Sequence, residues 1–220
     1  MIRQLPLFPL GTILFPGATI NLHIFEERYR LMIGRCLESE TPFGVVLIQR
    51  GDEVEEGRLG ARAAEPYPVG TIAQISASVR LEDGRMLITA VGAERFRIES
   101  LDQSSPYLIA SVTPLPETVP TGVSAAASEL RATYERYWQA VAAATGAPIQ
   151  AEDPPGDPLD LAYHLADRLQ VSLERKQHWL ETDLMTRLRE LTGDLRAELA
   201  LMPTGQRKTG EGLSGLGSLN

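Results

Sequence analysis

The chain has 220 residues, of which 43% are hydrophobic, and its formal net charge at pH 7 is −8. That length suits one large domain or two small ones with a real core, and the negative charge disfavours phosphate-backbone binding as a main function. The single cysteine excludes an internal disulfide, and no apolar run is long enough to span a bilayer, so we expect a cytoplasmic protein with neither membrane nor nucleic-acid partners.

The opening segment alternates prolines with large apolar residues in LPLFPLGTILFPGATINLHIFEERYR, residues 5–30. Proline has no N–H to donate to a ladder, so Pro6 and Pro9 predict a strand at a sheet edge or at a bulged corner. Pro16-Gly17 indicates a turn, and TINLHIF after it predicts a strand.

A helix is predicted over 26–39, because Glu26 and Glu27 place negative charge in a first turn, where the helix dipole favours it. Its apolar residues recur at helical spacing, so this face should lie against a sheet. Cys36 belongs to that face, which favours a buried thiol over a nucleophile paired with His23.

Strands follow the helix. FGVVLI, 43–48, predicts a buried strand, and 49–66 is predicted to be a solvated loop. TIAQISASVRL, 71–81, alternates cleanly and predicts a half-buried strand with Ala77 and Val79 on the inward face. A hairpin turn at 82–85, a return strand, a bend at Gly92 and a last strand over 107–115 together indicate a small barrel-like sheet.

Residues 123–202 predict helices. An aromatic stripe ends at Gly146, and 150–158 is a turn-rich connection. Asp157, Ser172, and either Thr182 or Asp183 are placed to cap the three following helices. Residues 203–220 contain five glycines and little that could pack, so we predict a flexible tail.

The sequence contains few motifs of catalytic, metal-binding or nucleotide-binding sites. Residues 210–215 match G-x-G-x-x-G, but the chain ends five residues later, whereas a dinucleotide site needs a strand before the motif and a helix after it. There is no phosphate-binding P-loop, no H-x-x-x-H pair and only two lysines, Lys176 and Lys208. We therefore predict no enzyme, no metal and no cofactor.

The opening LPLFPL…PG…HIFE…RY pattern, together with YPVGTIAQI, DGRMLITAVGAERFRI and PYLIASV, resembles the N-terminal domain of Lon proteases. The segment LERKQHWLETDLMTRLREL, 173–191, resembles the helical part of the same family. The resemblance implies an α+β fold with a PUA-like β pseudo-barrel carrying an inserted helix, followed by an α-helical bundle. It also implies a PUA-like subdomain over 1–119, a helical bundle subdomain over 120–202 and the tail over 203–220.

The resemblance carries no catalytic residue onto this chain, because the ATPase and serine–lysine protease of Lon lie downstream of this domain. It implies a non-catalytic protein that binds unfolded or tagged polypeptides, self-associates, and serves a protease or chaperone as an adaptor or regulator of protein quality control. An apolar groove between barrel and bundle, with main-chain pairing at an exposed edge, would provide the binding site. Its candidate residues are Phe15, His23, Arg28 and Tyr67, for each of which core packing is the competing interpretation.

Two alternatives stay open. One is a PUA-like module or enzyme acting on RNA or a small molecule, against which residues 1–119 carry 11 basic and 15 acidic side chains. The other is a structural oligomer without a ligand.

Overall fold

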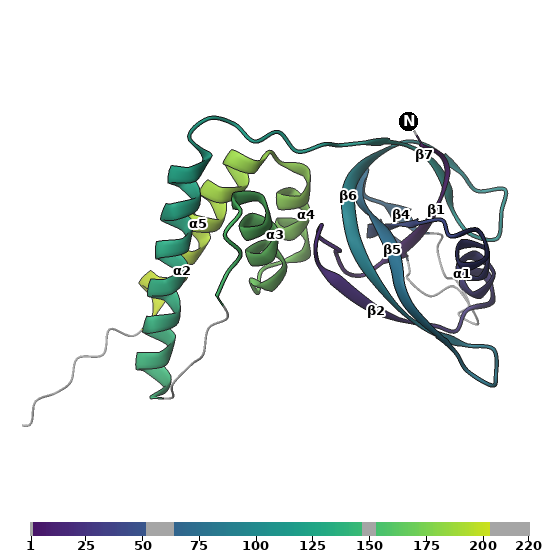
Figure 1. Ribbon diagram of the computed structural model, residues 1–220, viewed down its shortest axis with the longest axis horizontal. Helices are drawn as coiled ribbons and strands as arrows, with labels where there is room; N and C mark the ends of the chain where they lie inside the picture. The colour runs from purple at the N-terminus through teal and green to yellow at the C-terminus, as the bar shows by residue number, and fades with distance from the viewer. Residues whose placement is uncertain (1, 52–63, 147–152, 203–220) are drawn as a thin grey trace, which may run out of the picture.

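The computed structural model describes residues 2–51, 64–146 and 153–202. A strand-rich unit is followed by a unit of helices, with α1 on the side of the sheet that faces away from the other helices (Figure 1). The α+β class predicted from the sequence is confirmed, and no helix in the described residues is long and apolar enough to cross a membrane. The predicted tail, most of the predicted 49–66 loop and part of the 150–158 connection lie outside the described ranges.

The strands pair in a circuit. The sheet order is β1-β7-β6-β5-β3-β4, and a further parallel pairing of β1 with β3 closes the ring. The strand bounds are β1 Ile2–Leu10, β2 Thr19–Ile24, β3 Phe43–Arg50, β4 Glu65–Pro66, β5 Val69–Arg80, β6 Met86–Asp102 and β7 Ile109–Pro114. Whether this circuit is a PUA-like barrel in the family sense stays a prediction.

Strand β1 accommodates its prolines by changing partner part-way along. Its first half pairs antiparallel with β7, where Pro6 lies opposite Ile109. Its second half pairs parallel with β3, where Pro9 lies opposite Val46. A register shift follows Ile2. Each proline therefore pairs with one partner strand only, in a strand with a register shift, so the expectation of a sheet edge or a bulged corner is confirmed.

Helix α1 (Glu27–Ser39) covers one face of the sheet, as its apolar periodicity predicts. Tyr29, Met32, Ile33 and Cys36 are buried in a cluster with residues of β2, β5 and β6. Glu26 stands at the N-cap position, one residue before the helix, and its carboxylate pairs with Arg28.

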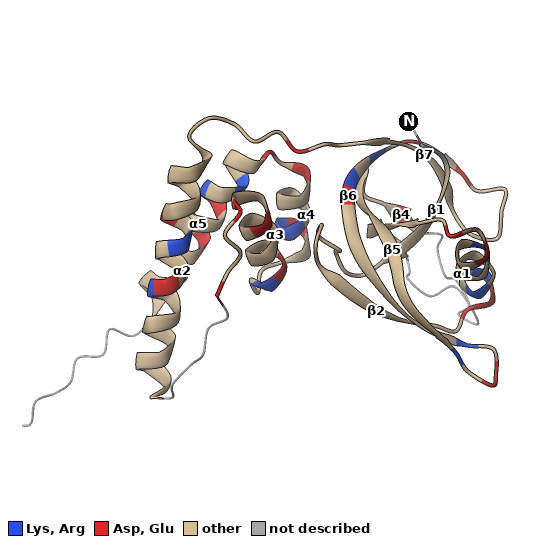
Figure 2. Ribbon diagram, viewed as in Figure 1, with Lys and Arg blue, Asp and Glu red and all other residues tan. Residues whose placement is uncertain are grey.

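Strand β5 departs from the predicted alternation. Val69 through Ala73 are all buried, because this half is enclosed on both faces, whereas Ala77 and Val79 are exposed rather than inward. Beyond Ala73, β5 pairs with β6, which pairs in turn with β2 on its other side. We call this three-stranded extension, residues 19–25, 74–80 and 86–91, the arm (Figure 1). Figure 2 shows charged residues gathered at the hairpin that joins β5 to β6, at the end of the arm.

Four helices form the second unit: α2 Val123–Thr145, α3 Pro158–Arg168, α4 Leu173–Glu181 and α5 Leu184–Leu201. The predicted caps are confirmed, since the side chains of Asp157, Ser172 and Asp183 each accept a main-chain N–H in the first turn of α3, α4 and α5. Gly146 ends α2 in the left-handed conformation.

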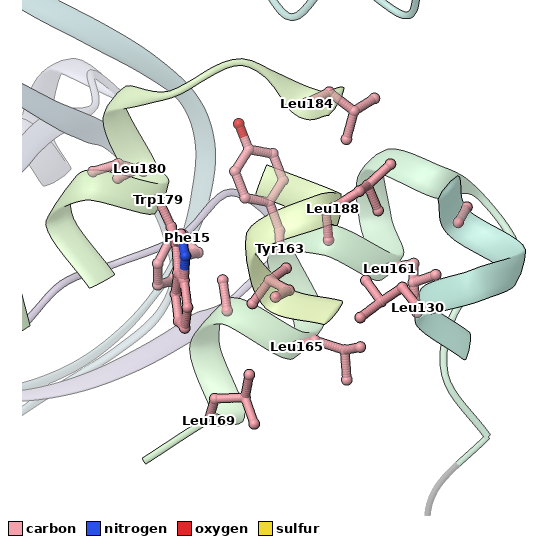
Figure 3. Packing of buried hydrophobic residues seen from close by; sticks show 14 of the residues in the cluster. Phe15, Leu130, Leu161, Tyr163, Leu165, Leu169, Trp179, Leu180, Leu184 and Leu188 are labelled. Carbon is pink, nitrogen blue, oxygen red and sulfur yellow. The ribbon is translucent and has the colours of Figure 1, made fainter. Parts of the chain in front are cut away.

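One apolar cluster joins the two units. Phe15, from the segment between β1 and β2, is buried with Val69 of β5 and with Trp179 and Leu180 of α4 (Figure 3). Gln177 of α4 donates to the carbonyl of Val69 at 3.0 Å. Shared burial fills part of the junction where an apolar groove was predicted, and a cavity of about 310 Å³ remains there between Pro16–Ala18 and polar residues of α3 such as Asp160 and His164. The division into subdomains at 119/120 stays a prediction.

Candidate functional site

Two of the four predicted site residues lie in or against the shared core. Phe15 has no exposed surface, and its ring centroid lies 6.1 Å from that of Tyr163 on α3. Tyr67 is partly buried against the same cluster, and its N–H donates to the carbonyl of Leu47. The structure thus gives both residues packing contacts, and their part in binding stays a prediction.

Arg28 lies elsewhere, near the start of α1. Its guanidinium is 3.0 Å from the Glu26 carboxylate and 4.5 Å from the ring centroid of Tyr29. It lines a cavity of about 170 Å³ together with Tyr107. Its charge is paired with the buried Glu26 carboxylate, which holds Arg28 in place, and its part in binding stays a prediction.

His23 is the predicted residue that lies on an open apolar surface. Its side chain is exposed on β2, with its ring centroid 5.8 Å from that of Phe25. Strand pairing sets His23 opposite Leu87, and Leu87 opposite Val79. Residues opposite each other in a ladder share a face, so these side chains form one row across the arm.

A second row, Asn21, Thr89 and Ala77, lies beside the first, and the Thr89 hydroxyl donates to the Asn21 side chain at 2.8 Å. We call the two rows, with Phe25, the arm face. Its three large apolar side chains keep much of their surface in solvent: Val79 is 58% exposed, Leu87 46% and Phe25 45%. Exposed apolar groups this close together are typical of surfaces that bind another molecule.

The surface is hollowed along these rows. A depression of about 460 Å³ is lined by nine residues, none of which is Asp, Glu, Lys or Arg. Sequence reasoning missed Phe25, Val79 and Leu87 because the alternating pattern of 71–81 does not reveal where the strand leaves the core. The register with β2 and β6 is what identifies them.

A buried cluster of charged side chains lies between the two units. Glu117, in the connection from β7 to α2, accepts from Arg95 of β6 at 2.8 Å and from Arg187 of α5 at 2.9 Å, and also from the Tyr163 hydroxyl. Burial raises the pKa of Tyr163. Arg187 is fully buried and donates further to the carbonyls of Trp179 and Thr182. These groups pair around the Glu117 carboxylate and hold the helices on the sheet.

Groups suited to covalent or metal chemistry are sparse in the described ranges. Burial raises the pKa of the Cys36 thiol, which disfavours its reactive thiolate form. Burial also lowers the pKa of Lys176, whose ammonium group donates to the carbonyl of Asp167. Within 2–51, 64–146 and 153–202, no three His, Cys, Asp or Glu side chains are placed to hold a metal ion. What the arm face offers is shape, apolar surface and strand edges.

Comparison with known proteins identifies the family. Residues 4–196 match the family described as the ATP-dependent protease La (LON) substrate-binding domain. The chain belongs to this family, and the resemblance stated from its opening pattern is confirmed.

Solved structures and curated relatives agree. A Lon N-terminal domain protein from Xanthomonas campestris is 26% identical with a TM-score of 0.58, over 92% of this chain and 100% of that one. The N-terminal domain of a Lon protease from the Mycobacterium avium complex shares the fold. It is 20% identical with a TM-score of 0.62, over 88% of this chain and 98% of that one.

Among curated relatives, the Lon protease of Anaeromyxobacter dehalogenans is 27% identical over 81% of this chain, and Lon protease 2 of Myxococcus xanthus is 27% identical over 85%. This chain spans only 21% and 23% of their respective lengths. The match to the family lies in the substrate-binding domain and includes no catalytic domain.

Proposed function

We propose that this protein binds unfolded or tagged polypeptides without cleaving them, as an adaptor or regulator of protein quality control in the cytoplasm. The observation that carries the proposal is the match over residues 4–196 to a substrate-binding domain. Its partners would be polypeptide substrates and a protease or chaperone that receives them, and self-association would add binding sites.

The arm face supports this function physically. Polypeptides that fail to fold expose apolar side chains, and burial of such groups gains about 25 cal/mol for each Å² removed from water. Val79 and Leu87 supply apolar surface that is already held in place by strand pairing, and Phe25 adds to it next to His23. Because that surface is preorganised, little ordering opposes binding on the protein's side.

Fluorescence anisotropy tests the proposal. The probe is fluorescein-labelled, reduced and carboxymethylated α-lactalbumin, a permanently unfolded chain, with native α-lactalbumin as the matched folded control. We expect saturable binding of the unfolded probe and none of the folded one. Absence of binding to the unfolded probe at protein concentrations up to about 100 µM would exclude affinities of use to an adaptor and overturn the proposal.

The RNA alternative is tested in the same assay with a labelled 20-nucleotide poly(U) probe. The nine residues that line the arm depression provide no Lys or Arg for phosphates. We therefore expect no binding. Binding of the RNA with an affinity that falls steeply as salt rises would favour the RNA-binding alternative, because counterion release makes phosphate binding salt-dependent.

A further inference from the structure

We infer that an extended, uncharged polypeptide segment docks on the arm as an added strand, along the edge of β5 from Gln74 to Arg80 that no described strand pairs with. This inference rests on the proposed function and specifies its substrate class: a segment with alternating apolar residues that can adopt β conformation. Recognition would combine main-chain hydrogen bonds along β5 with apolar contacts on the arm face.

The edge of β5 carries the first part of the argument. Strand β3 pairs with β5 only at Thr71, Ile72 and Ala73. From Gln74 onward, the ladder partner among the described residues is β6, on one side. Every residue from 74 to 80 except Ile75 is exposed, so neither a strand nor a helix of the described chain covers this edge.

Unpaired N–H and C=O groups along a strand edge recur at the spacing of an extended main chain. A polypeptide strand satisfies that pattern at every step, and neither a lipid nor a nucleic acid does. Such strand addition is a recurrent mode of peptide recognition, in which main-chain bonds give affinity and the flanking pockets give side-chain preference.

The flanks of the edge supply those pockets. At its beginning, where β3 separates from β5, a cavity of about 430 Å³ has a mixed lining: Leu37, Pro42, Ile75 and Cys36 together with the polar Glu40, Thr41 and Gln74. Further along lies the depression of about 460 Å³ on the arm face, beside Ala77 and Val79. Alternate side chains of an added strand point to opposite faces of the sheet, so a docked segment can place residues over both.

Charge decides what kind of segment fits. Strand β2 and residues 86–91 of β6 contain no Lys, Arg, Asp or Glu, and the only such residue of β5 is Arg80, at its end (Figure 2). A strongly charged segment would lose hydration on docking, and between Ile75 and Val79 the strands of the arm offer it no ion pair, since charges lie at the two ends, at Glu40 and Arg80. The surface therefore complements an uncharged segment.

The test uses the full chain and a labelled peptide of sequence Ser-Val-Thr-Val-Thr-Val-Thr-Ser. A second peptide carries N-methyl groups on alternate residues, which removes N–H donors along one edge and keeps every side chain. We expect binding of the first peptide and at least about a tenfold loss for the second. Equal affinity for the two peptides would show that main-chain pairing is absent and would overturn the inference.

Matched variants locate the site. Ala77→Lys places a charge on the exposed arm, where lysine is an effective block to strand addition, and should weaken peptide binding at least about tenfold. Ala144→Lys makes the same change on the exposed end of α2 and should leave binding unchanged. Circular dichroism confirms that both variants fold, and a benzophenone group in the peptide should cross-link to β5 and not to β2 or the helices.

The outcomes separate the inference from the function on which it rests. If unfolded α-lactalbumin binds equally to wild type and to Ala77→Lys, the docking site is wrong while polypeptide binding stands. If neither unfolded α-lactalbumin nor the Ser-Val-Thr-Val-Thr-Val-Thr-Ser peptide binds the wild-type protein, the proposed function itself fails. If sedimentation equilibrium shows a dimer that Ala77→Lys dissociates, and no peptide binds, the occupant is a second copy of this chain and the inference is overturned.

Discussion

Replacing Glu117 by Gln should substantially lower the free energy of unfolding. The substitution keeps the shape of the side chain and removes its charge, so it leaves no cavity. In the wild type, one carboxylate oxygen of Glu117 lies within 2.9 Å of the guanidinium groups of both Arg95 and Arg187. Only 11% of the Glu117 side chain is exposed, and the two arginine side chains are 7% and 0% exposed.

The magnitude follows from what the substitution leaves behind. Breaking a buried ion pair by removing one partner costs about 3–5 kcal/mol, because the remaining charge stays buried without compensation. Arg95 keeps the carbonyls of Leu180 and Thr182, and Arg187 keeps those of Trp179 and Thr182, so the lower end applies. We expect a loss of about 3 kcal/mol, or a decrease in Tm of about 6–12 °C for a chain of this size.

Urea unfolding followed by tryptophan fluorescence measures the loss. The two tryptophans are Trp179, at the junction of the two units, and Trp138, on α2, so the change in emission reports unfolding at both places. Glu94→Gln, at an exposed position of β6, is the matched control and should change stability by less than about 0.5 kcal/mol. If Glu117→Gln unfolds at the same urea concentration as wild type, the charged cluster does not hold the helices on the sheet, and the reasoning is refuted.

Three further results are expected. Gly92→Ala should lower the free energy of unfolding by at least about 2 kcal/mol, because a Cβ there would lie 2.3 Å from the main-chain oxygen of Phe15. Gly193→Ala, in open space on α5, should raise the free energy of unfolding by about 0.5–1 kcal/mol, and thermal melts of the two variants compare these effects. Asp183→Ala should cost about 1 kcal/mol at pH 7. Hydrogen bonds from Thr186 hold the pKa of Asp183 below its ordinary value of 3.8. The stability difference between wild type and Asp183→Ala should therefore persist at about pH 5 and vanish as pH falls through the lowered pKa. Urea titrations at several pH values measure this difference, and an increase of it in acid would contradict the expectation. Cys36 should react with Ellman's reagent at least about tenfold more slowly in the native chain than in urea, and equal rates would show that its burial is not maintained.

Local chemistry made the helices predictable. Asp157, Ser172 and Asp183 precede apolar periodicity, and each accepts a first-turn N–H in the structure, because a cap acts within three residues of itself. The buried face of α1 was likewise readable from spacing alone. The family pattern at the opening implied the α+β fold, which the elements of the structure and its structural neighbours confirm.

The candidate site was less accessible to such reasoning. Of the predicted residues, Phe15 is enclosed in the shared core and His23 lies on the arm face, although both are aromatic residues near turns. The sequence contains no local signal that separates these outcomes. They depend on which segment meets the helices, and that contact joins residues more than 150 positions apart, such as Phe15 and Trp179.

What the amino-acid sequence determined by itself was the set of elements, since caps, turns and periodicity act over a few residues and need no distant partner. What only the tertiary structure decided was the partner of each edge and face. Strand β1 divides its prolines between two neighbouring strands, and β5 changes from enclosed to exposed after Ala73. Burial depends on long-range pairing and packing, and an alternating pattern is the same whether its apolar face meets a core or solvent.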